Sequence, residues 1–296
     1  MSAAAREVLA RTAGTTPFPD PTDVNAWHRV IAAGNQGMRA YFATLDLSTR
    51  TRREVIRGVD VWVTSDEEGS ASDSVILDIH GGAMILGGGD LAGLIARRSA
   101  HGTGRLHWAV DYRMPPDHPF PTPVDDVATV LDYLIGRIGA EHVAVMGGSA
   151  GGNLAVAALV RRRDQHRPMP AALILEAPEV DLTESGDSFV TLAAASNTLQ
   201  SLLPVNRLYA AGRDLADPAL SPLFADLHGL PPTLLWTGTR DLFLSNTVRL
   251  HRALIAAGTE AHLHVWDGMP HGGFPDAPEG QEVNSTVRQF LRDRGL

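Results

Sequence analysis

Short apolar runs alternate with helix-length segments along most of this 296-residue chain. The runs are VILDIH (75–80), LHWAVDY (106–112), VAVMGG (143–148), ALILEAP (172–178), TLLWTG (233–238) and HLHVWDG (262–268). They are rich in β-branched or large apolar residues, as expected of strands buried on both faces. The segments between or after them include 123–137, 151–163, 243–257 and 280–293. Together with two shorter strands within 53–63, this alternation predicts an α/β fold: a mainly parallel sheet of about eight strands with helices on both faces.

Two regions depart from this alternation. Apolar residues recur at helical spacing in the first 45 residues, for example at Trp27, Ile31 and Met38. A long stretch also separates the strand that ends near Pro178 from the strand that starts at Thr233. We expect residues 1–45 to form an N-terminal helical cap segment and residues 46–296 the catalytic domain, with a further cap insertion at about 180–215.

Composition and charge exclude several classes of protein. The chain has no cysteine, which rules out disulfides, thiolate nucleophiles and cysteine-ligated metals. Its formal net charge is -9, and its densest basic cluster, Arg161-Arg162-Arg163, is short, so we expect no nucleic-acid partner. Arg6 and Arg11 interrupt the stretch where a secretory signal would be apolar, and no apolar run approaches membrane-spanning length. We therefore expect a cytoplasmic protein without membrane insertion.

Ser149 lies in a G-x-S-x-G pattern between a predicted strand and a predicted helix. The strand VAVMG leads into Gly147-Gly148-Ser149-Ala150-Gly151-Gly152, and the helical segment NLAVAALV follows. A nucleophilic serine on such a sharp turn needs small neighbours, and the helix behind it directs backbone N–H groups toward developing negative charge. The alternative is a glycine-rich turn with a helix-capping serine. The strand–turn–helix context favours the nucleophile.

A serine hydroxyl needs a base and an orienting carboxylate, which follow the serine in the chain order acid, then histidine. Asp241 comes just after the strand TLLWTG, and His271 comes just after the strand HLHVWDG. Loops at the carboxyl edge of a parallel sheet converge, so both side chains are predicted to approach Ser149. The alternatives are a turn or helix-capping role for Asp241 and an ordinary loop histidine.

The oxyanion of a tetrahedral intermediate needs hydrogen-bond donors. His80-Gly81-Gly82-Ala83 follows the strand VILDI directly, and glycines allow the backbone N–H groups to reach a substrate. We assign the oxyanion hole to the N–H groups of Gly81, Gly82 and Ala150. An ordinary glycine turn is the alternative at this loop.

These motifs together resemble the hormone-sensitive-lipase-like branch of α/β-hydrolases, the bacterial family IV esterases with an HGG motif. The resemblance runs from His80 to the C-terminus through HGGA, DYRMPPDHPFP (111–121), GGSAGG, DLTESGDS (181–188), SPLFADLHGLPP (221–232), GTRD and GMPHGGF. It implies the α/β-hydrolase fold, a triad of Ser149, Asp241 and His271, a helical cap, and no cofactor or metal. The implied substrates are small-molecule esters of short to medium acyl chains.

The sequence departs from the family pattern beside the nucleophile. Gly148 stands where the family usually has Asp, and Glu176-Ala177-Pro178-Glu179 stands where many members have a Ser-Pro-Trp-type segment. An acidic side chain near the pocket would disfavour anionic substrates and favour polar or cationic ones. The segment Tyr112–Asp117 replaces the family's Tyr-Arg-x-x-Pro-Glu, and we expect its charges to form a structural network behind the oxyanion loop.

Other patterns carry weaker alternatives. Gly87-Gly88-Gly89 with Asp111 imitates a dinucleotide fingerprint but does not directly follow its strand. His262 and His264 share a strand face, as metal ligands would, but no third ligand is placed nearby. Five residues of the insertion either line a lipophilic pocket or pack the insertion: Leu199, Leu202, Leu203, Leu208 and Tyr209.

The sequence thus predicts a serine carboxylesterase. Lactone hydrolases and amidases use the same triad, and a non-catalytic ligand-binding protein on the same scaffold is the alternative from another class. A homodimer is compatible with the sequence.

Overall fold

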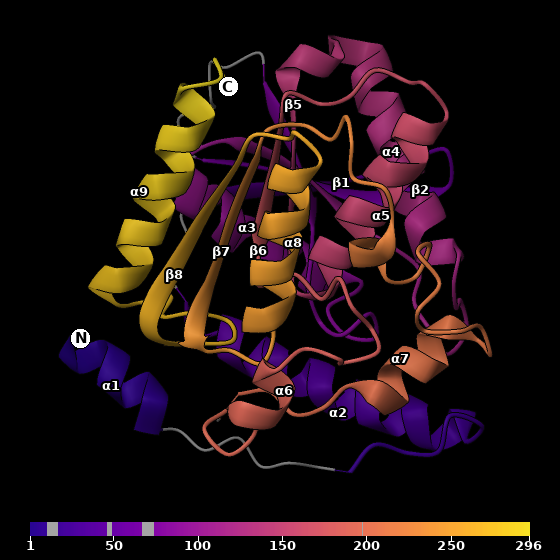
Figure 1. Ribbon diagram of the computed structural model, residues 1–296, viewed down its shortest axis with the longest axis vertical. Coiled ribbons are helices and arrows are strands. Elements are labelled where there is room, and N and C mark those ends of the chain that lie inside the picture. Colours follow the sequence, from indigo (N-terminus) through magenta and orange to yellow (C-terminus); the bar gives the residue numbers. More distant parts are fainter. Residues whose placement is uncertain (11–16, 46–48, 67–73, 197) are drawn as a thin grey trace.

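An eight-stranded sheet runs through the centre of the molecule in the computed structural model, which describes residues 1–10, 17–45, 49–66, 74–196 and 198–296 (Figure 1). The strands are β1 (Thr49–Ile56), β2 (Val59–Asp66), β3 (Val75–Ile79), β4 (Leu106–Asp111), β5 (Val143–Gly148), β6 (Ala172–Glu176), β7 (Thr233–Arg240) and β8 (Ala261–Pro270). Their order is β1-β2-β4-β3-β5-β6-β7-β8. β1, β2 and β4 pair antiparallel, and all strands from β4 to β8 pair parallel. The predicted α/β fold with a mainly parallel sheet is confirmed.

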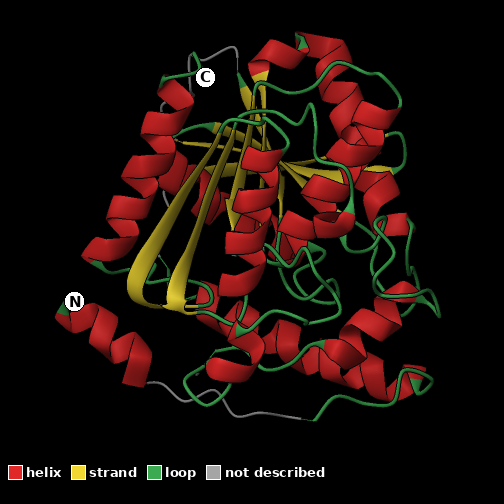
Figure 2. Ribbon diagram, viewed as in Figure 1, coloured by secondary structure: helices red, strands yellow, loops and turns green. Residues whose placement is uncertain are grey.

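Helices cover both faces of the sheet (Figures 1 and 2). One face carries α4 (Thr122–Ile138), α5 (Ala150–Asp164) and α8 (Leu244–Ala256), and the other carries α3 (Asp90–Thr103) and α9 (Pro278–Arg292). Because side chains alternate along a strand, neighbours such as Ile76 and Leu77 of β3 belong to different apolar clusters. Both are almost completely buried. The apolar runs were therefore continuous because both sides of each strand face helices.

Three further helices lie beyond the carboxyl ends of the parallel strands (Figure 1): α2 (Val24–Phe42), α6 (Ser188–Thr191) and α7 (Leu203–Ala210). Asp23 begins α2 by accepting a 2.9 Å hydrogen bond from the Ala26 N–H group, as expected of a helix cap. Trp27 of α2 is fully buried in an apolar cluster that also contains Leu202 and Phe243. The N-terminal region and the long insertion therefore pack together over this edge of the sheet.

The first helix, α1 (Ala3–Ala10), lies elsewhere, beside the carboxyl end of β8 and the start of α9 (Figure 1). The Ser2 N–H group donates a 2.6 Å hydrogen bond to the Glu279 carboxylate, and Ala5 packs in the same apolar cluster as Phe290. Within residues 1–10 and 17–45, α1 and α2 thus contact the rest of the chain at two separate places. None of the helices in the described ranges is both long and apolar enough to cross a bilayer.

Candidate active site

Ser149 lies on the turn between β5 and α5, with the backbone angle φ at 54°. This left-handed conformation is costly for a residue with a side chain and persists only where the surroundings impose it. They do so here because the turn is very close to its neighbours. A Cβ atom on Gly151 would lie 1.9 Å from the Ile79 carbonyl oxygen, and one on Gly147 would lie 2.4 Å from the Gly151 carbonyl oxygen. Only glycine fits at either position, so the turn is specified by its own residues.

The structure brings Asp241, His271 and Ser149 into one chain of hydrogen-bonding contacts. The His271 Nε2 atom lies 3.1 Å from Ser149 Oγ, and its Nδ1 atom lies 3.0 Å from an Asp241 carboxylate oxygen. β7 extends to Arg240 and has an irregularity between Gly238 and Arg240, which places Asp241 at the end of the strand. The arrangement leaves Nε2 free to accept the serine proton while Nδ1–H donates to the carboxylate.

The electrostatic setting of His271 favours its protonated form. Burial is the largest single effect and would lower the pKa of His271, but the surrounding carboxylates, with Asp241 contributing most, together raise the pKa above its ordinary value. The carboxylates of Glu176 and Glu179 act in the same direction. Asp241 is 1% exposed and accepts a 2.8 Å hydrogen bond from the Phe243 N–H group, which fixes the carboxylate toward the imidazole. The site is therefore built to stabilise an imidazolium ion.

The loop after β3 brings Gly81 and Gly82 to the same place. A Cβ atom on Gly81 would lie 3.3 Å from the Ser149 Cβ atom, so the two backbones approach closely. Gly82 has φ at +118° and forms a tight turn, in which the Leu86 N–H group donates a hydrogen bond to the Gly82 carbonyl oxygen. Among the described residues, the N–H groups of Gly81, Gly82 and Ala150 have no acceptor. Unpaired backbone donors on the loop and the turn that flank Ser149 are groups that can bind an oxyanion.

His80 and Tyr112 support this loop from behind. The two rings stack with centroids 4.2 Å apart, and the Tyr112 hydroxyl donates a 2.8 Å hydrogen bond to the His80 carbonyl oxygen. Burial lowers the pKa of His80 to about 4, so its ring is neutral and its Nδ1–H group donates to the Gly81 carbonyl oxygen at 2.7 Å. Tyr112 had been noted only within a motif, because its contact depends on the pairing of β3 with β4.

The charges of the segment after Tyr112 do not form the network we expected behind the oxyanion loop. Arg113 pairs with Asp126 of α4 at 2.7 Å, and Asp117 lies 3.2 Å from His28 of α2 at the surface. The support comes from the tyrosine ring and hydroxyl, whereas the charged side chains connect α4 and α2 to the sheet domain.

A cavity of about 500 Å³ opens over Ser149 and His271. Its walls come from the oxyanion loop, from α2 and from the insertion, and most of them are apolar. The larger apolar side chains lining it are Phe18, Val30, Ile85, Leu86, Leu199 and Leu202. A cavity of this size and lining suits a small organic ligand. Of the five insertion residues, Leu199 and Leu202 line the cavity, Leu208 and Tyr209 are buried in the packing, and Leu203 is half-buried outside the cavity lining. Phe18 had no sequence signal, since nothing local indicates that it lies over the site.

The two glutamates that follow β6 have different surroundings. Glu176 lines the cavity together with Gly148 and Ser149. Glu179 is 1% exposed and lies behind the nucleophile turn, where its N–H group donates a 3.0 Å hydrogen bond to the Ser149 carbonyl oxygen. Burial raises the pKa of Glu179 to about 8 and also raises the pKa of Glu176. Of the acidic residues in this segment, Glu176 is therefore the one that faces a bound molecule.

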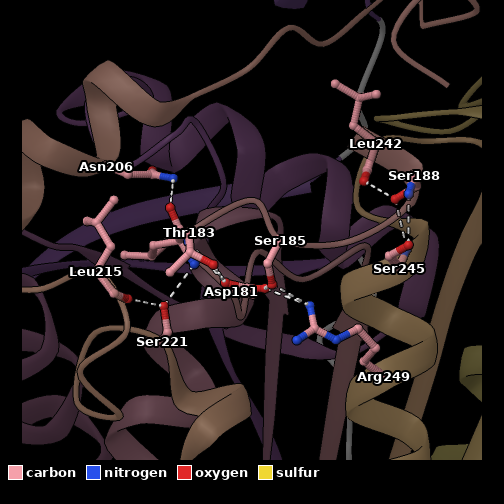
Figure 3. A network of polar contacts seen from close by, with 11 residues as sticks. Asp181, Thr183, Ser185, Ser188, Asn206, Leu215, Ser221, Leu242, Ser245 and Arg249 are labelled. Atoms are coloured by element: carbon pink, nitrogen blue, oxygen red, sulfur yellow. Dashed lines mark hydrogen bonds and ion pairs between the residues drawn. The ribbon is translucent and has the colours of Figure 1, made fainter. Parts of the chain in front are cut away.

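The start of the insertion is anchored by a polar network shown in Figure 3. The Asp181 carboxylate accepts hydrogen bonds from Ser185 and from Arg249 of α8, both at 2.6 Å. The Ser188 hydroxyl donates a 2.5 Å hydrogen bond to the Leu242 carbonyl oxygen, immediately after Asp241. The motif DLTESGDS thus connects the insertion to α8 and to the loop that carries Asp241.

The weaker patterns have other surroundings in the structure. The Gly89 N–H group donates to the Asp111 carboxylate at 2.9 Å, so these residues contact each other. His262 lies 2.8 Å from the Glu260 carboxylate at the surface. No group of three histidine or acidic side chains within the described ranges is arranged to hold a metal ion.

Comparison with known proteins identifies the family. Residues 76–275 match the model of a family described as having the alpha/beta hydrolase fold. An acetyl-hydrolase of Streptomyces hygroscopicus is 33% identical over 73% of this chain and 75% of its own length. The crystal structure of an esterase superposes with a TM-score of 0.92 at 35% identity, covering 98% of this chain and 93% of that one. An esterase of the bacterial hormone-sensitive lipase family superposes with a TM-score of 0.84 at 31% identity, covering 98% and 95%.

The chain therefore belongs to the α/β-hydrolases, and within them to the hormone-sensitive-lipase-like esterases that the sequence resembles.

Proposed function

We propose that this chain is a serine carboxylesterase that hydrolyses small carboxylic esters through an acyl-enzyme, with Ser149 as nucleophile, His271 as base and Asp241 as the carboxylate that orients it. The observation that carries the proposal is the continuous contact from Asp241 through His271 to Ser149, at 3.0 and 3.1 Å, beneath a largely apolar cavity. The esterases and acetyl-hydrolases among its relatives support the same reaction class.

The reaction follows from these positions. Ser149 Oγ attacks the ester carbonyl while its proton passes to His271 Nε2, and the N–H groups of Gly81, Gly82 and Ala150 stabilise the oxyanion. His271 then gives the proton to the leaving alcohol, which leaves an acyl group on Ser149. Water attacks this acyl-enzyme with His271 again acting as base, and the carboxylic acid is released.

The helices at the carboxyl edge form the cap in this proposal. Residues of α2 and of the insertion at about 180–215 close the cavity and select the acyl or alcohol part of the ester. The apolar lining and the size of the cavity favour esters with short to medium acyl chains.

A series of p-nitrophenyl esters of increasing acyl length, measured with the wild-type chain and with Ser149→Ala, tests the proposal. Loss of the nucleophile should lower kcat on the order of a millionfold. Thermal unfolding of both proteins controls for folding. Equal turnover by the two proteins would exclude the assignment of Ser149. Failure of a fluorophosphonate to label the wild-type chain would instead favour the non-catalytic binding protein.

Lactone hydrolases and amidases use the same triad and are the alternatives, so measuring lactones and amides beside the esters separates these activities. A homodimer and a cytoplasmic location remain predictions from the sequence, which light scattering of the purified chain and cell fractionation would check.

A further inference from the structure

Glu176 places a carboxyl group in the wall of the cavity beside the nucleophile. It ends β6, and its backbone carbonyl oxygen accepts a 2.8 Å hydrogen bond from the Ser149 N–H group, so its position relative to Ser149 is fixed. Glu176 is the only acidic side chain among the described residues that line this cavity, and His271 is the only basic one. Most other lining groups are apolar or uncharged. A charged group in such a setting acts strongly on whatever is bound.

The Glu176 carboxyl group has no hydrogen-bond or ion-pair partner among the described residues. Besides His271, Arg98 is the cation that lowers the pKa of Glu176; it lines a second cavity together with Glu176, and its guanidinium donates a 2.7 Å hydrogen bond to the Tyr41 hydroxyl. A carboxylate that is partly removed from water and left unpaired is unfavourable by itself. A bound molecule that brings a positive charge would satisfy it.

Gly148 leaves the approach to this carboxyl group open. A Cβ atom on Gly148 would lie 3.6 Å from both the Glu176 Cβ atom and one of its carboxylate oxygens. Any longer side chain at residue 148 would therefore lie against the carboxyl group. Because residue 148 is glycine, a substrate bound at Ser149 is free to take that place.

The wider charge distribution has the same sign. Asp241 and Asp78 also contribute negative potential at Glu176, and the whole chain has a formal net charge of -9. Negative potential around a cavity draws cationic molecules toward it and repels anionic ones.

We infer that Glu176 is a specificity-determining residue that selects esters carrying a cationic group, such as an ammonium, a few bonds from the scissile carbonyl. This inference rests on the proposed function, because the selected molecule is the ester that Ser149 attacks. Glu176 takes no part in bond breaking: it contributes attraction to a charge on the substrate, and the hydrolysis itself is unchanged.

Pairs of esters with the same shape and different charge test the inference. On the alcohol side the pair is acetylcholine and 3,3-dimethylbutyl acetate. On the acyl side it is p-nitrophenyl 4-(trimethylammonio)butanoate and p-nitrophenyl 5,5-dimethylhexanoate. Within each pair a positive nitrogen replaces a carbon, so the ratio of the two kcat/KM values reports charge alone.

The variant is Glu176→Gln, which keeps the shape and removes the charge. For the pair whose cation faces Glu176, the wild-type ratio should favour the cationic ester, and Glu176→Gln should lower that ratio on the order of tenfold, the size of one charge-assisted contact. Because Glu176 also raises the pKa of His271, its variant can change the kcat/KM of the neutral ester as well, and a change common to both esters cancels in the ratio. Glu282→Gln, on the exposed side of α9, removes the same charge far from the cavity and should leave every ratio unchanged.

The pH dependence of the wild-type ratio gives a second measurement that needs no variant. Both esters of a pair use the same His271, so its titration cancels in the ratio. Burial raises the pKa of Glu176, and Arg98, His271, Asp241 and Asp78 also act on it. The preference for the cationic ester should therefore appear as pH rises through this pKa and disappear as pH falls below it.

The outcomes separate this inference from the proposed function. Hydrolysis of the neutral esters that Ser149→Ala abolishes supports the proposed function whatever the ratios are. Ratios near one for both pairs, or ratios that Glu176→Gln leaves unchanged, would overturn the role of Glu176 alone. Absence of turnover of all four esters by the wild-type chain would overturn both.

Discussion

Ser149 and Asp241, the two ends of the proposed triad, are held in place by different kinds of interaction. Ser149 depends mainly on its immediate neighbours, because Gly147 and Gly151 allow the turn, and two backbone hydrogen bonds with Glu176 and Glu179 hold it in place. Asp241 depends on a segment far away in the chain, because Ser188 of the insertion holds the carbonyl group that follows it. Changes near Ser149 should therefore affect chemistry directly, whereas changes around Asp241 should act through the position of His271.

The largest effect after loss of the nucleophile is expected for Asp241→Asn. The amide cannot hold the imidazole in the tautomer that accepts the serine proton, so kcat should fall by about 10⁴. His271 must be neutral to act as base, and its raised pKa predicts that wild-type kcat/KM falls below a pH higher than 6.5, the ordinary histidine value. The variant should shift this acidic limb to lower pH.

A pH profile of kcat/KM for one neutral ester, measured with both proteins, checks this. A variant that loses less than tenfold in kcat, or that keeps the acidic limb at the wild-type pH, would remove Asp241 from the triad.

The second-largest loss of kcat is expected for Gly82→Ala, in the glycine loop beside Ser149. A Cβ atom there would lie 2.3 Å from the Leu86 carbonyl oxygen, and φ of +118° is unfavourable for alanine. The loop must shift and misplace its N–H donors, so kcat should fall by roughly 10²–10³. Gly37→Ala is the matched control, because a Cβ atom on this exposed α2 residue meets nothing within 4 Å. Similar kinetics for the two variants would argue against the oxyanion role.

The contrast between local and long-range contacts also explains how much of the fold and the site could be predicted from the sequence. The strands, the nucleophile turn and the glycine loop follow from local pattern, because strand burial and tight turns are determined by adjacent residues. Which glutamate faces the cavity was not predictable. Alternation along β6 stops at Glu176, and the next residue, Ala177, has φ at 38°, so the direction of later side chains depends on that turn. The contact of Phe18 with the site depends on the packing of the N-terminal region and has no local signal.

A third, smaller effect on turnover is expected for Asp181→Asn, in the network that anchors the loop carrying Asp241. The Asp181 side chain is fully buried, and the hydrogen bonds from Ser185, Thr183 and Arg249 outweigh burial and lower the pKa of Asp181. Losing the charge should reduce the free energy of unfolding by about 2 kcal/mol. The loop before α8 should loosen, and kcat should fall only a few-fold.

Urea unfolding and ester turnover, compared with Asp217→Asn, measure this. Asp217 is a more exposed carboxylate with a weak pair to Arg213, so its variant should change stability by less than about 1 kcal/mol. Equal loss of stability in the two variants would mean that the buried network does not anchor the insertion.

Glu179→Gln, behind the turn that carries Ser149, is expected to have the smallest effect on turnover. Its effect on stability should depend on pH. The pKa of Glu179 is about 8 in the folded chain and about 4.3 when unfolded, so the folded state binds the extra proton between these values. Wild-type stability should therefore fall as pH rises through this window, by as much as about 1.4 kcal/mol per pH unit, and glutamine should abolish that loss. The pKa of Asp181 is lowered instead, so its contribution to the free energy of unfolding is complete above about pH 4. Asp181→Asn should therefore be destabilised equally from pH 6 to pH 9. Unfolding free energies of both variants over that range distinguish the two carboxyl groups. A difference between Glu179→Gln and wild type that stays constant with pH would show that Glu179 is already ionised behind Ser149.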